Sequence, residues 1–339
     1  MDETPLPLGK LPGDLLARLL ARYAAPDERL LVGPGVGRDA AAIALDEARA
    51  LVVKSDPITF ATADVGWYLV NVNANDLACL GATPRWMLAT ALLPAGRTTA
   101  ASVEALFAGL AGACAGLGIT LAGGHTEITH GLDRPILVGA LLGEAAREEL
   151  VAPGNARAGD VVLLTKGIAV EGTALIAGER EGEVAARHGA EFAARCRAFL
   201  REPGIGVVRD AAVARASGPD HALHDPTEGG VATGLRELAI AAGLGLAVDA
   251  DALPIYPETA TLCADYGLDP LGLIASGSLL IAAPPGSAEP IVAGLRAAGI
   301  AAAAIGRLTP PGEGLRLRRD GRDEPLPAFA ADEVTKLFG

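Results

Sequence analysis

One stretch decides the fold of this chain: Asn71-Val72-Asn73-Ala74-Asn75-Asp76-Leu77-Ala78-Cys79-Leu80-Gly81-Ala82-Thr83-Pro84. Around it, apolar residues recur at three- and four-residue steps, which predicts a helix over residues 64–81. Three Asn fall within five residues, although each costs a helix roughly 0.5–0.7 kcal/mol relative to Ala. Two interpretations stay open. Either the Asn side chains and Asp76 face a ligand, a cation or a second subunit, or the helix is buried and its Asn residues cap neighbouring loops.

The composition is that of a large, layered protein. The chain has 339 residues, which is enough for two domains with separate cores. Hydrophobic residues make up 50% but aromatic residues only 4%, so the core must consist of Ala, Val, Leu and Ile, as in α/β and α+β proteins. The formal net charge of −13 argues against a nucleic-acid partner, because binding to a phosphate backbone requires a cationic surface.

The cysteines and the apolar segments indicate where the protein resides. The four cysteines contain no CxxC pair, which argues against a zinc ribbon and a disulfide framework. The first ten residues are acidic and proline-rich where a signal peptide would be apolar. Residues 105–124 carry no charge, but their glycines and their Gly-Gly ending do not suit a membrane-spanning helix. We therefore expect a soluble, cytoplasmic protein without a membrane partner.

Both halves of the chain alternate short strands with helices, which predicts two layered units. Pro, Gly, Asn and Arg accumulate near residues 151–160, so we place the domains at residues 1–152 and 153–339. A strand over residues 50–54 is expected to deliver Asp56 to its exit, where Pro57 stops regular pairing. A strand over residues 119–122 is expected to lead into a turn at residues 123–127. In the second half we expect a long polar helix over residues 183–200 and a polar hairpin over residues 315–327.

Four carboxylates are candidate ligands: Asp39, Asp56, Asp76 and Asp225. Two unit charges about 4 Å apart repel by roughly 4 kcal/mol at an effective dielectric constant of 20. Several converging acids therefore require a divalent cation, or some of them become protonated. Carboxylate oxygens beside Asn amides favour Mg²⁺, which commonly binds substrate phosphates as well. Taken singly, each Asp also fits a turn or a helix cap.

The glycine-rich segments allow two interpretations each. Residues 33–37 form neither a Walker loop nor a Rossmann fingerprint, and a plain loop explains them. Gly123-Gly124-His125-Thr126-Glu127 can present backbone N–H groups to an anion, while His125 alone also fits a packed histidine. Thr227-Glu228-Gly229-Gly230 opens a helix whose N–H groups suit a phosphate, or are capped by Asp225 or Thr227. A GxSxG elbow, an HExxH motif and a cysteine with a nearby histidine are all missing from the sequence.

Six motifs follow one another along residues 30–308. They are Asp39-Ala40-Ala41-Ala42-Ile43, Lys54-Ser55-Asp56-Pro57, Asn75-Asp76-Leu77-Ala78-Cys79-Leu80-Gly81-Ala82, Gly123-Gly124-His125-Thr126-Glu127, Asp225-Pro226-Thr227-Glu228-Gly229-Gly230 and Ala275-Ser276-Gly277-Ser278-Leu279-Leu280. In this order they resemble the motifs of the aminoimidazole-ribonucleotide synthetase (PurM-like) superfamily, and within it the HypE-type hydrogenase-maturation branch.

The resemblance implies a fold and a site. The implied fold has an N-terminal α/β domain, whose mixed sheet forms a homodimer interface, and a C-terminal α+β domain, with ATP and Mg²⁺ bound between them. The implied metal ligands are Asp39, Asp56, Asp76 and Asp225. The implied cofactor-binding residues are Asp39, Asp56, Asn75, Gly123, Gly124, His125, Thr227, Gly229 and Gly230. The implied catalytic residues are Lys54, Asp76, Glu127 and Asp225.

Departures from the HypE-type pattern bear on the activity. HypE-type proteins carry a C-terminal cysteine that holds the carbamoyl group to be dehydrated, whereas the last cysteine here is Cys263. His125 stands where family members often have an acid, and Glu127 where HypE-type proteins have lysine. Selenophosphate synthetases have a reactive residue near the N-terminus, but no cysteine precedes Cys79. Thiamine-monophosphate kinases match the first half better than residues 166–173 and 275–278.

Two functions are therefore expected as alternatives. The first is an ATP-dependent, Mg²⁺-requiring enzyme that phosphorylates a small carbonyl-type or phosphate-accepting substrate, with a thiamine-monophosphate kinase-like activity as a variant. The second is a catalytically altered nucleotide-binding accessory or regulatory protein that acts on a protein partner of the maturation type.

Overall fold

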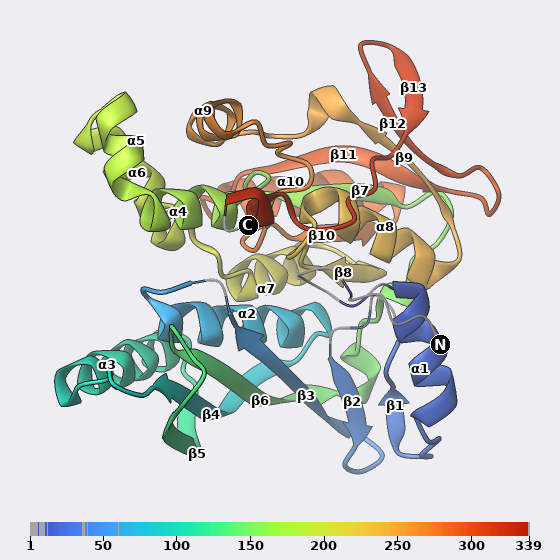
Figure 1. Cartoon of the computed structure of the whole chain (residues 1–339). Coiled ribbons are helices and arrows are strands. Elements are labelled where there is room, and N and C mark those ends of the chain that lie inside the picture. Colours follow the sequence, from blue (N-terminus) through green and yellow to red (C-terminus); the bar gives the residue numbers. More distant parts are fainter. Residues whose placement is uncertain are drawn as a thin grey trace.

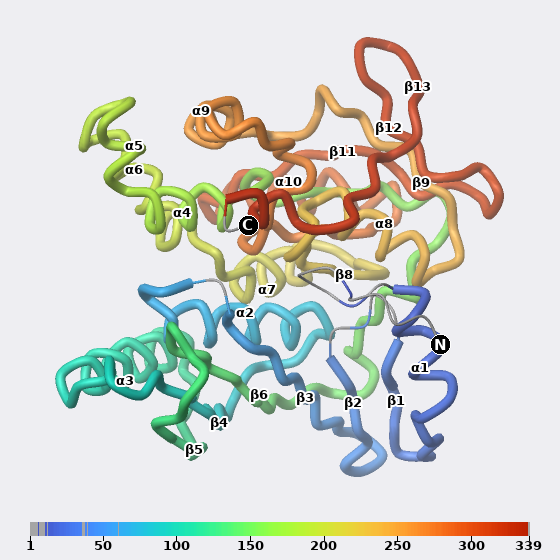
Figure 2. The backbone as a smooth tube through the Cα atoms, in the orientation of Figure 1, coloured from blue at the N-terminus to red at the C-terminus, as the bar shows by residue number. Residues whose placement is uncertain are grey.

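The chain folds into two α/β bodies stacked on each other. The computed structural model describes residues 13–35, 40–59 and 61–337, together with Leu6, Leu11 and Arg38. Each body contains one sheet, and the strands of each sheet come from one half of the chain (Figure 1). The tube in Figure 2 shows the first half of the chain in the lower body and the second half in the upper one. The predicted division at residues 152 and 153 falls between the two sheets, and its limits stay a prediction.

The first sheet has six strands in the order β1-β2-β3-β6-β4-β5. They are β1 (Leu30–Val32), β2 (Ala41–Ala44), β3 (Arg49–Ile58), β4 (Thr83–Pro94), β5 (Thr120–Thr129) and β6 (Ile136–Ala146). The β4–β5 pair is parallel and the other pairs are antiparallel, so the sheet is mixed, as predicted. The amphipathic helix α1 (Gly13–Tyr23) precedes it.

The predicted central helix is α2 (Val65–Cys79), which lies between the two bodies. It packs on β3 and β6 on one side, on α3 (Ala100–Gly116) along its flank, and on α7 (Val208–Ser217) of the second body. All of its residues except Trp67 are buried. This position explains why α2 lacks a charged face: no side of the helix is left for water.

Two details of the first sheet differ from expectation. Pro57 does not end β3, because it pairs with Val138 of β6. β3 pairs with β2 only over residues 50–53, and Pro57 lies beyond this stretch. Pro57, which has no N–H, can therefore face the side of β3 that makes no ladder hydrogen bonds to β2 in the described residues. Residues 123–127 form no turn either: they belong to β5, which continues to Thr129 as an edge strand.

The second sheet has seven strands in the order β13-β12-β9-β11-β7-β10-β8. They are β7 (Val161–Thr165), β8 (Ala222–His224), β9 (Gly245–Asp249), β10 (Leu280–Ala283), β11 (Ala302–Thr309), β12 (Leu315–Arg319) and β13 (Arg322–Pro325). Helices α4 (Val170–Glu179), α8 (Gly230–Ala242), α9 (Pro257–Tyr266) and α10 (Pro285–Ala297) complete this body with α7. The polar hairpin is confirmed as β12–β13.

The predicted long polar helix is in fact two helices. They are α5 (Glu181–His188) and α6 (Ala190–Ala198), which are separated by Gly189. Gly189 has φ 90°, a left-handed conformation that ends α5. In the described part of the chain, no helix is both long and apolar enough to span a bilayer.

Candidate functional site

The centre of the candidate site is a cluster of Lys54, Asp56 and Asp76. The ammonium nitrogen of Lys54 lies 2.9 Å from Asp76 Oδ2 and 3.5 Å from Asp56 Oδ2. Lys54 and Asp56 are two residues apart on β3, so both side chains point to the same face of the sheet. This is the face that α2 covers, and α2 supplies Asp76, which is buried. The sequence predicted a divalent cation to balance these carboxylates. In the structure, Lys54 supplies part of that positive charge.

The second body adds residues to this cluster from the other side. Asp76 lines a cavity at the boundary between the bodies together with Arg38, His224 and Asp225. Asp56 lines a neighbouring cavity with residues that include Thr227 and Glu228. The structure thus brings together Lys54, Asp56, Asp76, Asp225 and Thr227 from the predicted site. Asp39 lies outside the described residues.

The donor set at this boundary suits Mg²⁺. Three carboxylates, Asp56, Asp76 and Asp225, approach it from the two bodies, and Mg²⁺ is commonly bound by one or two carboxylates together with phosphate oxygens. The described residues contain no preformed group of three or more His, Cys, Asp or Glu arranged to hold a metal without such oxygens. The residues therefore fit a metal that arrives with a polyphosphate better than a metal held by protein alone.

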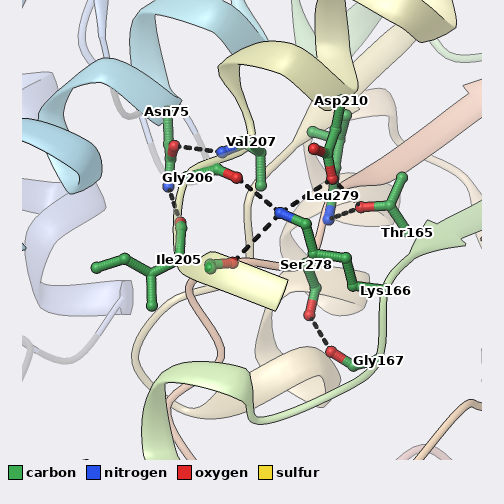
Figure 3. A network of polar contacts seen from close by, with 11 residues as sticks. Asn75, Thr165, Lys166, Gly167, Ile205, Gly206, Val207, Asp210, Ser278 and Leu279 are labelled. Atoms are coloured by element: carbon green, nitrogen blue, oxygen red, sulfur yellow. Dashed lines mark hydrogen bonds and ion pairs between the residues drawn. The ribbon is translucent and has the colours of Figure 1, made fainter. Parts of the chain in front are cut away.

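The Asn residues of α2 bind backbone groups, as the second interpretation of the helix proposed. Asn75 is fully buried, and its side chain donates to Ile205 O at 2.8 Å and accepts from Val207 N at 2.7 Å (Figure 3). Asn73 accepts from Asp56 N at 3.1 Å and donates to Leu69 O at 2.8 Å. Asn75 thus joins the two bodies, and Asn73 holds Asp56 against α2. The predicted role of Asn75 in cofactor binding stays a prediction.

Lys166 of the second body also binds the loop that Asn75 holds. Lys166 Nζ donates to Gly206 O at 2.6 Å and to Gly204 O at 3.3 Å, and lies 3.2 Å from Asp210 Oδ2 (Figure 3). Asp210 also accepts from the hydroxyl of Thr165 at 2.7 Å. Burial lowers the pKa of Lys166, while the charge of Asp210 opposes this shift. This network positions residues 204–207, and through Asn75 it sets how α2 faces the second body.

The segment from Gly123 to Glu127 lies away from the cluster. In the first sheet Asp56 is opposite Gly139, Gly139 is opposite Ala89, and Ala89 is opposite Gly124. Three strand spacings therefore separate Asp56 from Gly124, which is roughly 14 Å. The side chains of His125 and Glu127 are exposed on the edge strand and lie 3.4 Å from each other.

The close packing of β5 on β4 explains why residue 124 is glycine. A Cβ atom at this position would lie 1.8 Å from Ala89 O, so only glycine allows β5 to approach β4 here. Within one chain, Gly123, Gly124, His125 and Glu127 do not join the carboxylates. Their predicted roles stay predictions, and they require a second subunit that brings its own β5 to the site.

The backbone N–H of Gly229, at the start of α8, binds a carboxylate of the chain itself, that of Asp332. Gly229 N donates to Asp332 Oδ2 at 2.6 Å, and Ile274 N and Val334 N donate to Asp332 Oδ1 at 3.2 and 2.8 Å. Burial raises the pKa of Asp332 to about 6, against the lowering effect of these three hydrogen bonds. The N-cap of α8 is Gly229, no side-chain cap is formed there, and the predicted capping by Asp225 or Thr227 stays a prediction. The predicted binding of a cofactor by Thr227, Gly229 and Gly230 stays a prediction.

Among the boundary residues that sequence reasoning missed, Glu171 has the strongest perturbation. It is 5% exposed on α4 and lines the same cavity as Asp56 and Thr227. Burial raises the pKa of its carboxyl group to about 8, partly offset by the nearby Ser276. Its signal in the sequence is that it is the only charged residue in an apolar run, residues 167–178.

Together, the two bodies and the charged cluster define a two-domain α/β protein whose candidate site lies at the domain boundary. Comparison with known families agrees. The AIR synthase related protein family matches with its N-terminal domain over residues 37–145 and its C-terminal domain over residues 157–317. The chain belongs to this family. The predicted PurM-like superfamily and two-domain fold class are therefore confirmed.

Several of the similar proteins are HypE-type proteins. The carbamoyl dehydratase HypE of Rhodobacter capsulatus is 31% identical over 255 residues, which span 74% of this chain and 72% of the relative. A solved HypE–HypF complex matches with a TM-score of 0.74 at 20% identity and covers 93% of this chain and 99% of that chain. A solved HypE in complex with ATP matches with a TM-score of 0.67 at 24% identity, covering 93% of this chain and 90% of that chain. The predicted HypE-type branch is confirmed by these relatives.

Proposed function

We propose that this chain is an ATP-dependent, Mg²⁺-requiring enzyme that phosphorylates a small carbonyl-type or phosphate-accepting substrate. The observation that carries the proposal is the pairing of Asp56 and Asp76 with Lys54 in the first domain, with Asp225 of the second domain lining the same cavity as Asp76. A HypE relative has been solved in complex with ATP, which supports a nucleotide as the ligand.

Each residue of the cluster has a role in this proposal. Asp56 and Asp76 would hold Mg²⁺, and Asp225 would approach it from the second domain. When bound, Mg²⁺ neutralises charge on the polyphosphate and orients the phosphate that is transferred. Lys54 holds Asp56 and Asp76 in place, and its ammonium group offsets negative charge beside the phosphates. Asn73 orients Asp56 through its backbone N–H.

Mg-ATP is expected to raise the melting temperature of the protein by a few degrees. Ligand at about 100 times its dissociation constant stabilises the folded state by roughly 2.7 kcal/mol. Asp76→Asn should abolish this shift, because it removes a charged ligand next to Lys54. Calorimetry measures the shift in melting temperature. Equilibrium dialysis with ATP at 10 °C, a temperature at which the variant should be folded, measures its nucleotide binding directly. The exposed Asp323→Asn is the control. Wild-type protein that Mg-ATP does not stabilise would refute the proposal.

The accessory-protein alternative also has a supporting observation. His125 and Glu127, which differ from the HypE-type pattern, lie on the exposed edge strand away from the carboxylates. This alternative predicts that Mg-ATP binds and that no ADP is released with any acceptor. Measuring ADP release therefore separates the accessory-protein alternative from the proposed enzyme. The predicted protein partner of the maturation type stays a prediction.

We also propose that the protein is a homodimer in which the first sheets of two chains meet. On one face of the sheet, β4 exposes two large apolar side chains beside the edge strand β5, Trp86 at 40% and Leu88 at 41%. A dimer through this surface would cover them and bring residues 123–127 of one chain towards the partner.

Sedimentation velocity tests this surface. Wild-type protein is expected to sediment at twice the chain mass of 34.2 kDa. Leu88→Glu should shift it to the monomer, because the substitution places a charge in an apolar interface. Ile240→Glu is the matched control, since Ile240 is 54% exposed on α8 of the second body. A wild-type monomer, or dimers in both variants, would contradict the proposal.

A further inference from the structure

A second cleft between the two bodies shares no lining residue with the cavities at Asp56 and Asp76. Its volume of about 690 Å³ is within the usual range of small-molecule sites. Its walls come from the end of α2 and the start of β4 in the first body, and from α7 and the segment after it in the second. Most of the side chains that line it are small and apolar, among them Ala78, Ala82, Pro84, Ala211, Ala212 and Ala216.

The charged residues that line this cleft are Glu149, Arg215 and Asp220. Arg215 of α7 reaches across the boundary, where its Nη2 donates to Glu149 O of the first body at 2.7 Å. Its guanidinium group also packs against Gly81, because a Cβ atom at residue 81 would clash with Nη1. Nη1 itself donates to no described residue. Arg215 is thus held in place from the first body and keeps Nη1 as a donor.

Asp220 lies beside Arg215 but is only loosely paired with it. Arg215 Nε is 3.9 Å from Asp220 Oδ1, which is longer than a hydrogen bond. The side chain of Asp220 is 7% exposed, and burial raises its pKa although the charge of Arg215 opposes this shift. No other described residue donates a hydrogen bond to Asp220 Oδ2, which is buried. A further donor from a ligand would therefore stabilise this carboxylate.

A base and an acid in this arrangement match the charged end of an α-amino acid. The ammonium and carboxylate groups of an amino acid are attached to the same carbon atom, so their two partners must lie side by side, as Arg215 and Asp220 do. Each group can then form a charge-assisted hydrogen bond of about 2.7–2.9 Å. A ligand with only a negative charge would be repelled by Glu149 and Asp220, and one with only a positive charge by Arg215.

We propose that this cleft binds an α-amino acid with an apolar side chain. The carboxylate of the ligand accepts from Arg215 Nη1, its ammonium group donates to Asp220, and its side chain contacts the alanines of α7. Because both bodies line the cleft, the bound ligand also stabilises their contact beside α2. The inference goes beyond the proposed phosphorylation and requires no nucleotide.

Matched ligands test the site by ligand-observed NMR titration in the absence of ATP. The first set is L-leucine, 4-methylpentanoate and 3-methylbutylamine, and the second is L-phenylalanine, 3-phenylpropanoate and 2-phenylethylamine. In each set the second compound lacks the ammonium group and the third lacks the carboxylate. Wild-type protein is expected to bind at least one of the amino acids with a dissociation constant of about 1 mM or lower. It should bind both analogues of that amino acid at least tenfold more weakly.

Two variants assign the two ends of the ligand. Asp220→Asn should remove the preference for the amino acid over the analogue without an ammonium group, because the partner of that group loses its charge. Arg215→Gln should remove the preference over the analogue without a carboxylate, and Arg215→Lys, which keeps the charge, should retain part of it. Glu289→Gln removes one carboxylate from the exposed face of α10, so it is the matched control and should bind as wild type.

Three outcomes would overturn the inference: neither amino acid binds, an analogue with a single charge binds as tightly as its amino acid, or Asp220→Asn keeps the wild-type preference as Glu289→Gln does. Asp220→Asn alone decides the matter if circular dichroism shows that the Arg215 variants are unfolded. The titrations contain no ATP, so their failure leaves the proposed function standing. Failure of Mg-ATP to stabilise the protein likewise leaves this inference standing.

Discussion

Replacing Lys166 by Met is expected to lower the free energy of unfolding by about 3–5 kcal/mol, because it leaves a buried charge without its partner. The side chains of Lys166 and Asp210 are 7% and 3% exposed, and their charged atoms lie 3.2 Å apart. The substitution also removes the donor for Gly206 O and Gly204 O. Urea denaturation followed by circular dichroism measures the loss.

Two further variants establish the cause. Lys336→Met is the control, because Lys336 is 55% exposed and its pair with Glu333 is worth less than about 1 kcal/mol. The double variant Lys166→Met, Asp210→Leu should recover part of the loss, since it removes both charges and leaves no uncompensated one. Equal losses in Lys166→Met and Lys336→Met would contradict the buried network.

The second large effect is a dependence of stability on pH that originates at Glu171. The pKa of Glu171 is about 8 in the folded protein and 4.5 for an ordinary glutamate, so between these values the folded state binds a proton that the unfolded state releases. The stabilisation is therefore complete below about pH 4.5 and is lost as the pH rises through 8. A shift of this size corresponds to roughly 5 kcal/mol.

Glu171→Gln should remove this dependence. We expect the free energy of unfolding of wild type, minus that of the variant, to fall as pH rises from 4 to 9. Asp332, whose pKa burial raises to about 6, titrates in both proteins, so most of its contribution cancels in the difference. Denaturation curves at five pH values measure the difference, and Glu289→Gln should leave it constant. If the free energies of unfolding of wild type and Glu171→Gln instead change in parallel with pH, Glu171 is ionised in the folded protein and the prediction is wrong.

Much of the fold could be predicted because it depends on local patterns. The spacing of apolar residues around Ala74 and Leu77 predicts α2 within two residues of its observed limits. Alternation along β3 places Lys54 and Asp56 on one face whatever the sheet pairs with. The order of the six motifs was enough to indicate the superfamily. These features depend on residues that are close in sequence, so they are visible without the structure.

The candidate site depended on contacts between distant segments. The Asn-rich face of α2 suited a ligand and a loop cap equally well in sequence. Only the packing of residues 205–207 against α2 shows that Asn75 joins the two bodies. Residues 123–127 contain glycines that also suit a turn, and their place in an edge strand follows from pairing with β4.

What the sequence alone determined is which segments become helices and strands, which side chains share a face, and which superfamily the chain belongs to. Those properties follow from periodicity and from backbone preferences within a few residues. The tertiary structure alone decided that Lys54 stands between Asp56 and Asp76, that Asp332 binds Gly229 N, and that Glu171 is buried among acids. A pKa and an ion pair depend on burial and on neighbours brought from far along the chain, and these exist only once the two bodies have packed together.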